Sequence, residues 1–221
     1  VYKRQGQALR LEMSLPQRER RVYERAKRLL DIVATGAGLL MLAPLFALVA
    51  IAIRLDSSGA VLFSQTRVGR HGRTFRCWKF RSMFVDAEAR KAALMADNEM
   101  DGGVIFKMKR DPRITRVGRF IRKASIDELP QLWNVFTGDM SLVGPRPAVP
   151  AEVAQYTPYE RQRLAVTPGI TCFWQVSGRS NLPFDEQVRL DIHYAQVRSL
   201  WVDISLLLRT VPAVLFARGA Y

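Results

Sequence analysis

Cysteine and histidine are scarce in this chain of 221 residues. It contains two cysteines, Cys77 and Cys172, and two histidines, His71 and His193. Neither cysteine belongs to a Cys-x-x-Cys pair, so a disulfide scaffold is excluded and a zinc site built from these ligand types is not expected. With 48% hydrophobic residues the chain can bury a substantial core without such staples.

Two common nucleotide-binding signatures are also missing. No Gly-x-x-x-x-Gly-Lys-Ser/Thr loop occurs, which excludes a P-loop NTPase. Gly36 and Gly38 lie inside an apolar run and do not form a dinucleotide-binding fingerprint. Acidic residues are few, with 20 Asp and Glu against 34 Lys and Arg, a net charge of +14. Such an excess attracts phosphates, which can belong to nucleic acid, anionic lipid or a phosphorylated substrate.

What the chain does have is one long uncharged run, residues 32–53. As a straight helix this run spans about 33 Å, enough to cross the hydrocarbon core of a bilayer. Basic residues flank it on both sides, and by the positive-inside rule both flanks belong in the cytoplasm. A straight span cannot satisfy both flanks, whereas a helix broken at Pro44 can enter and return to the same face. We therefore expect a re-entrant helix, the alternative being an ordinary span that Pro44 kinks.

The rest of the chain predicts an α+β fold, mostly helical, compact and cytosolic. Residues 61–65 and 74–83 read as the two strands of a short β-hairpin. No linker divides the chain, so one domain is expected. The apolar stretch 199–216 fits either a core helix or a helix in the membrane interface.

Adjacent carboxylates, Asp127 and Glu128, form the densest chemical signal. Ser125 and Glu128 match a Ser-x-x-Glu capping box, so the pair has a purely structural interpretation. Carboxylates at a helix start are also held ionised, which suits a nucleophile or a Mg²⁺ ligand. Basic residues precede the pair: Lys107, Lys109, Arg110, Arg113, Arg116, Arg119, Arg122 and Lys123. Two acids within a basic shell are typical of phosphoryl transfer.

Four motifs in fixed order carry a resemblance to a known family. They are Lys-Phe-Arg-Ser-Met at 79–83, Ser-Ile-Asp-Glu-Leu-Pro-Gln-Leu at 125–132, Gly-Asp-Met-Ser-Leu-Val-Gly-Pro-Arg-Pro at 138–147, and Pro-Gly-Ile-Thr at 168–171. With these motifs the chain resembles the bacterial sugar transferases, monotopic polyprenyl-phosphate phosphoglycosyl transferases. The similarity runs from about residue 22 to residue 221.

The resemblance implies a reaction and a place for it. Hexose 1-phosphate, galactose or glucose favoured, moves from a UDP-sugar to undecaprenyl phosphate and UMP is released, the first membrane step of exopolysaccharide, capsule or O-antigen synthesis. The setting is the cytoplasmic face of the bacterial inner membrane, against anionic lipid. The division implied is a polar segment 1–20 that can mark a fragment boundary, a re-entrant helix 21–55, and a catalytic domain 56–221 with C-terminal interfacial helices.

The family pattern also implies roles for individual residues. Asp127 is the expected nucleophile, forming a covalent phosphosugar intermediate, and Glu128 with Asp127 the expected Mg²⁺ site. The expected phosphate and nucleotide ligands are Lys79, Arg81, Arg122, Arg146 and Arg179. Arg179 and Asp191 are expected to help shape the nucleotide or sugar pocket, although each fits a surface or core ion pair equally well. Cys172, where many relatives have Gly, is interpreted as a packing residue.

Two other functions compete with this one. A membrane-anchored nucleic-acid-binding module fits the charge, but no recognition helix or RNA-binding aromatic motif is present, so no nucleic acid partner is expected. A scaffold that binds polyprenyl phosphate without chemistry also fits. The identity of the sugar and the existence of a homodimer stay open.

Overall fold

The computed structural model describes residues 17–91, 111–178 and 182–215. The helices are α1 (Gln17–Asp56), α2 (Ala87–Lys91), α3 (Arg116–Lys123), α4 (Gln131–Thr137), α5 (Pro150–Ala154), α6 (Phe173–Val176), α7 (Phe184–Val197) and α8 (Leu200–Leu215). The strands are β1 (Leu62–Val68), β2 (Thr74–Phe80), β3 (Ser141–Val143) and β4 (Gly169–Thr171). Short 3-10 turns are η1 (Arg70–Gly72), η3 (Ile126–Glu128) and η4 (Glu160–Ala165). This mixture of helices with small sheets confirms the α+β prediction.

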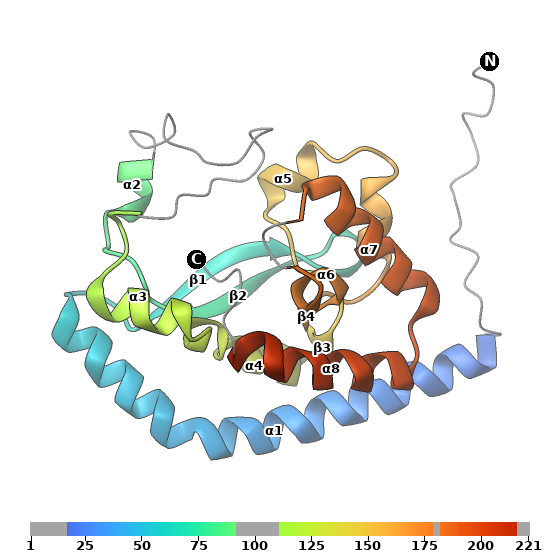
Figure 1. Cartoon of the computed structure of the whole chain (residues 1–221), viewed down its shortest axis with the longest axis horizontal. Helices are drawn as coiled ribbons and strands as arrows, with labels where there is room; N and C mark the ends of the chain where they lie inside the picture. Colours follow the sequence, from blue (N-terminus) through green and yellow to red (C-terminus); the bar gives the residue numbers. More distant parts are fainter. Residues whose placement is uncertain (1–16, 92–110, 179–181, 216–221) are drawn as a thin grey trace.

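Helix α1 runs along one whole side of the molecule and contains the uncharged run (Figure 1). By length and composition it is apolar enough to cross a membrane, and only 11% of its most apolar stretch is buried against the protein. The helix continues through Pro44 and is bent in its middle, so Pro44 bends α1 without ending it. Re-entrant insertion stays a prediction.

Strands β1 and β2 form the expected antiparallel hairpin, in a register that pairs Leu62 with Phe80 and Val68 with Thr74. The hairpin packs on α1 through a core cluster of Val49, Ile53 and Phe80 together with Ile121 of α3. The first sheet is thereby fixed between the membrane-type helix and the chain segment that leads to Asp127.

A second, parallel sheet pairs β3 with β4. Glycines make this close approach possible: a Cβ on Gly144 would lie 2.3 Å from the Thr167 carbonyl oxygen, and one on Gly169 would lie 2.1 Å from the Gly144 nitrogen. Two of the sequence motifs are therefore held together backbone to backbone. Sequence reasoning did not foresee this pairing, because strands of three residues are too short to show a periodic pattern.

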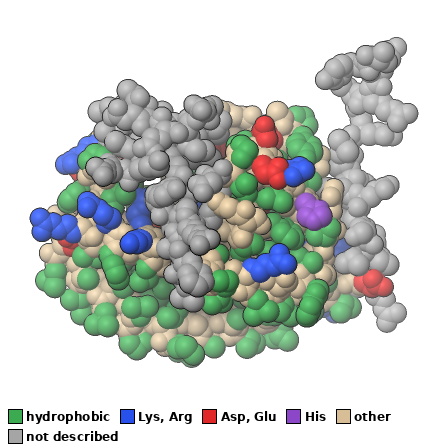
Figure 2. Space-filling model, viewed as in Figure 1, with side chains coloured by type: hydrophobic (Ala, Val, Ile, Leu, Met, Phe, Trp, Pro, Cys, Tyr) green, Lys and Arg blue, Asp and Glu red, His purple; other side chains and the backbone are tan. Residues whose placement is uncertain are grey.

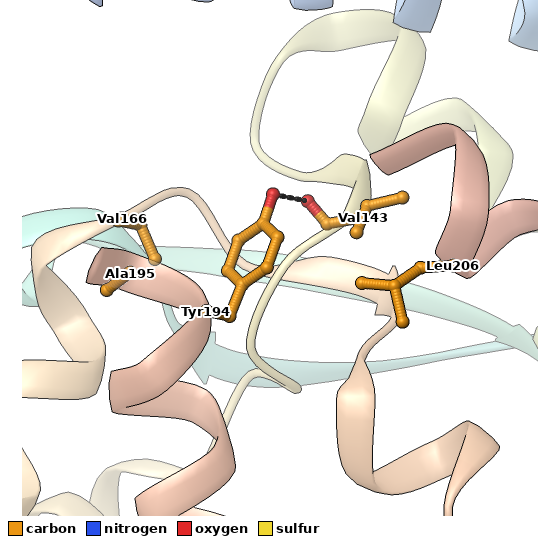
Figure 3. Close-up of a cluster of buried hydrophobic side chains, with 5 residues drawn as sticks. All are labelled: Val143, Val166, Tyr194, Ala195 and Leu206. Carbon is orange, nitrogen blue, oxygen red and sulfur yellow. Dashed lines mark hydrogen bonds between the residues drawn. The ribbon is translucent and has the colours of Figure 1, made fainter. Parts of the chain in front are cut away.

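The core beside this sheet is centred on Tyr194 of α7 (Figure 3). Its hydroxyl lies 3.1 Å from the Val143 carbonyl oxygen and donates to Asp203 Oδ1 of α8 at 2.7 Å. Tyr23 and Lys27 of α1 donate to the other oxygen of Asp203, at 2.9 and 2.8 Å. This network ties α1, α7 and α8 to one another.

Hydrophobic side chains gather along the edge of the molecule formed by α1 (Figure 2). Leu40 and Met41 of α1 are about four-fifths exposed, at 80% and 79%. Helix α8 has two faces, since Leu206 is buried in the core while Trp201 and Leu208 are exposed. The buried face agrees with the core-helix interpretation of the stretch 199–216, and placement of the exposed face in a membrane interface stays a prediction.

Candidate active site

Asp127 and Glu128 lie in the short turn η3, between α3 and α4. Ser125, which precedes the turn, adopts a left-handed conformation with φ 55° and makes no side-chain cap to it. Glu128 directs its carboxylate elsewhere, so the capping-box interpretation is wrong. A non-glycine residue in this strained region is typical of a functional site that the surrounding structure holds in place.

Two cations hold the Glu128 carboxylate. Lys79 Nζ of β2 donates to Oε1 at 2.7 Å, and Arg146 Nη2 donates to the same oxygen at 2.6 Å. Arg146 Nη1 also reaches Oε2 at 3.3 Å, which makes the contact a fork. Burial by itself raises the pKa of Glu128, but Arg146 and Lys79 outweigh it and bring that pKa well below its usual range. Glu128 is therefore ionised at neutral pH.

Asp127 has a different environment although it is the next residue. The residue is 8% exposed. Within the described part of the chain, no hydrogen bond or ion pair involves its carboxylate. Burial and the neighbouring charge of Glu128 raise its pKa to about 6, while Lys79, Arg122 and Arg146 oppose that rise. The result is a carboxylate without a fixed partner that lies among cations, which suits a nucleophile toward phosphorus.

Arg146 reaches Glu128 from the turn that follows β3. This turn is braced by Arg67 of β1, whose guanidinium donates to the Pro147 carbonyl at 3.0 Å and to Gln65 Oε1 at 2.6 Å. Burial and the nearby Arg146 lower the pKa of Arg67. Sequence reasoning missed Arg67; the one available signal was its position in a Thr-Arg-Val-Gly-Arg pentapeptide that occurs at 66–70 and again at 115–119.

Lys79 is brought to the site by a side-chain clamp between β2 and α4. Asn134, which is 1% exposed, donates to the Arg76 carbonyl at 2.7 Å and accepts from the Trp78 N–H at 3.0 Å. Because Trp78 directly precedes Lys79, this clamp sets the distance between Lys79 and Glu128. Asn134 was also missed, since a buried amide that bonds distant backbone groups has no sequence signature.

The remaining predicted ligands fall into three groups. Arg122 lies in the last turn of α3, close enough to lower the pKa of Asp127. Arg81 is turned away from Glu128 and donates to the carbonyls of Ser57 and Ser58 at the end of α1. Arg179 lies outside the described residues, as do three members of the basic run, Lys107, Lys109 and Arg110.

Asp191 and the two cysteines serve packing. Asp191 forms a buried ion pair with Arg163, so the structure decides for the ion-pair alternative at this position. Cys77 and Cys172 are free and buried. Cys172 is fully enclosed, which agrees with its interpretation as a packing residue.

The acidic pair can supply part of a metal site. In the described ranges no group of three or more His, Cys, Asp or Glu side chains gathers, so at this place the described residues offer two carboxylates. Mg²⁺ is commonly bound by one or two carboxylates together with water and substrate phosphates. The donor set thus fits Mg²⁺ that arrives with a diphosphate, and it does not fit a metal enclosed by protein ligands alone.

Comparison with known proteins shows the family of the chain. The chain is 50% identical to galactosyl transferase CpsE of Streptococcus agalactiae over 88% of its length, and 41% identical to an undecaprenyl-phosphate galactose phosphotransferase of Salmonella typhimurium over 100% of it. It spans 43% and 46% of those two proteins. It is 43% identical to a UDP-glucose:undecaprenyl-phosphate glucose-1-phosphate transferase of Caulobacter vibrioides, covering 88% of the chain and 72% of that protein. Residues 22–217 match the profile of the bacterial sugar transferases, and the chain belongs to this family.

Proposed function

We propose that the chain transfers a sugar 1-phosphate, with galactose or glucose favoured, from a UDP-sugar to undecaprenyl phosphate and releases UMP. The observation that carries the proposal is the contrast within the acidic pair: Lys79 and Arg146 bind Glu128, while no side chain of the described residues pairs with Asp127 beside it. The names of the relatives support undecaprenyl phosphate as acceptor and galactose or glucose as the sugar.

The site residues divide the chemistry among themselves. Arg146, Lys79 and Arg122 bind the diphosphate of the donor, whose oxygens compete with Glu128 for the cations. An Asp127 oxygen attacks the phosphorus that carries the sugar; the bond from that phosphorus to the bridging oxygen breaks, and UMP leaves with the electron pair. A phosphate oxygen of the lipid then attacks the same phosphorus and displaces the Asp127 carboxylate.

Mg²⁺ is part of the proposal, held by Glu128 and Asp127 when the donor is bound. When bound, it neutralises charge on the diphosphate. Arg81 is left out of the binding set because its guanidinium is occupied at the end of α1. Arg179 stays in the proposed set on the family pattern alone.

The apolar surface supports a location at the membrane. Trp133 and Phe136 stack on each other on α4 and are exposed, at 51% and 37%, whereas the polar residues Gln131 and Asn134 of the same helix are buried. A helix that turns its aromatic side chains outward is suited to an interface with lipid. We propose the cytoplasmic face of the bacterial inner membrane, with α1 inserted as a re-entrant helix.

The decisive test detects the intermediate directly. Membrane fractions containing the chain are incubated with UDP-glucose, UDP-galactose or their N-acetylated forms, with undecaprenyl phosphate and Mg²⁺, and UMP is measured. Intact-mass analysis without the lipid should show a sugar-phosphate adduct, which Asp127→Asn abolishes and the exposed control Asp185→Asn retains.

Two results contradict the proposal. If Asp127→Asn still releases UMP, Asp127 is not the nucleophile. If the wild type releases no UMP from any of these donors, the proposed reaction is wrong. Lack of an adduct combined with lipid binding would favour a non-catalytic scaffold. Glu128→Gln should weaken the dependence on Mg²⁺; an unchanged response contradicts the metal assignment.

A further inference from the structure

Helix α1 makes polar contacts with both chain segments that carry the site. Asp31, which is 3% exposed, accepts a hydrogen bond at Oδ1 from the backbone N–H of Leu142 in β3 at 3.0 Å. Arg28 donates to the carbonyls of Val135 and Phe136, the end of α4, at 2.6 and 2.7 Å. Gly138, the C-cap of α4 with φ 98°, lies beside this guanidinium.

These contacts are close in sequence to the catalytic groups. Helix α4 begins three residues after Glu128, and β3 ends at Val143, three residues before Arg146. One segment therefore holds the carboxylate and the other its guanidinium partner. Because α1 bonds to both, it is in a position to set the distance between them.

The Asp31 contact also completes a very short strand. Strand β3 pairs with β4 along one edge. Backbone N–H groups alternate between the edges of a strand, so the Leu142 N–H faces away from β4 and toward α1. A buried N–H that lacks a partner is costly, and Asp31 supplies the acceptor. A three-residue strand whose outer N–H lacks an acceptor is held in place poorly. The turn that follows it and carries Arg146 is then held poorly as well.

Asp31 also directly precedes the uncharged run 32–53. A helix that serves only as an anchor has no need of a buried carboxylate bonded to a distant strand. We propose that Asp31 is a positioning residue: through Leu142 it fixes β3 and thereby Arg146 against Glu128, which makes α1 part of the frame of the active site. The inference rests on the proposed function for its catalytic consequence, though not for its structural one.

The experiment compares three variants of the whole chain in membranes. Asp31→Leu removes the acceptor with a side chain that branches at the same atom, and Asp31→Asn retains an acceptor oxygen without the charge. Thr35→Val is the matched control: Thr35 is buried one turn further along α1, and its hydroxyl donates within α1, to the Asp31 backbone carbonyl at 2.6 Å. Amide hydrogen exchange at residue 142 and kcat and KM for the UDP-sugar are measured, with the folded fraction taken from thermal unfolding.

We expect Asp31→Leu to lose exchange protection at Leu142 and to reduce kcat per folded molecule about tenfold to a hundredfold, since small misplacements of a binding group are costly. Asp31→Asn should retain the protection and stay within about threefold of the wild type in kcat. Thr35→Val should lower stability without changing either readout. The KM for the UDP-sugar should change less than kcat, because the cations remain present and only their alignment is lost.

The inference is overturned if Asp31→Leu keeps Leu142 protected, if its kcat per folded molecule equals that of Thr35→Val, or if Asp31→Asn loses as much kcat as Asp31→Leu. The exchange measurement does not depend on any reaction. A wild type that is inactive with every donor, combined with the expected loss of protection, contradicts the proposed function and leaves the structural role of Asp31 standing.

Discussion

Two arginines bound in two regions of the molecule show how differently the same side chain is used. Arg146 reaches a side-chain carboxylate, that of Glu128, in the site. Arg81 reaches the segment directly after α1, where it donates to the backbone oxygens of Ser57 and Ser58 and to Ser57 Oγ. Residue Gly59, with φ 114°, makes this possible, because a Cβ there would lie 2.2 Å from Arg81 Nη1.

The difference lies in what can replace the partner. A diphosphate carries negative charge, as a carboxylate does, and likewise accepts the forked guanidinium, so Arg146 can exchange Glu128 for substrate. The carbonyls at the end of a helix must be satisfied in every state of the protein. Arg146 is therefore expected to affect catalysis, and Arg81 stability.

The largest effect should come from Arg146→Ala. We expect kcat/KM for UMP release to fall about 10²- to 10³-fold, the usual cost of removing a preorganised charge donor. The thermal midpoint should change little, since Lys79 still pairs with Glu128. Arg146→Lys keeps the charge but loses the forked contact, so its kcat/KM should lie between that of the wild type and that of Arg146→Ala. A variant with normal kcat/KM would remove Arg146 from the proposed site.

The next largest effect is expected in the pH dependence of adduct formation, which should differ between variants of Arg146 and Arg81. Asp127 must be ionised to attack, and its pKa of about 6 means that its reactive form decreases as the pH falls below that value. The rate of adduct formation should therefore drop about tenfold per pH unit on the acidic side. Since Arg146 helps to lower this pKa, the acidic limb should move to higher pH in Arg146→Ala and stay in place in Arg81→Met. The rate of adduct formation, measured from pH 5 to 8 at constant Mg²⁺, gives the acidic limb of each variant. An acidic limb at the same pH in Arg146→Ala and Arg81→Met contradicts the comparison.

Much of this site was predictable from the sequence, and Arg81 shows where prediction stopped. Asp127, Glu128, Lys79 and Arg146 stand in motifs, and the structure brings all four together. Arg81 follows Lys79 by two positions, a spacing that puts two residues on the same face of a strand. Strand β2 ends at Phe80, however, so the alternation does not extend to Arg81 and its side chain turns toward α1.

The contacts that fix the site were less accessible to sequence reasoning. The long apolar helix and the hairpin each have a periodic or compositional pattern, and both were predicted. The bonds from Asp31 to Leu142 and from Asn134 to Trp78 join residues more than 50 positions apart. In each, one partner is a backbone N–H, which every residue except proline carries, so no residue type indicates it.

A smaller effect is expected from Arg81→Met, and on stability alone. The substitution leaves the carbonyl oxygens at the end of α1 without their donor, which should cost about 1–3 kcal/mol. Activity per folded molecule should stay within about twofold of the wild type, because Arg81 bonds the backbone beside the end of α1 and not a group of the site. Thermal unfolding and UMP release on the same preparation test both statements, with the exposed Arg73→Met as control. A loss of activity that exceeds the loss of folded protein would return Arg81 to the substrate site.

The smallest effect should come from Gly59→Ala, which disturbs the same junction from its other side. The new Cβ displaces the Arg81 guanidinium, and alanine is strained at φ 114°, so we expect a loss of about 1 kcal/mol. The informative quantity is the double variant Gly59→Ala, Arg81→Met. If glycine is required chiefly to admit the guanidinium, the two losses overlap and the double variant is less destabilised than their sum. Full additivity in thermal unfolding would mean that Gly59 acts through its backbone conformation alone, and that the junction does not depend on Arg81 occupying the space beside it.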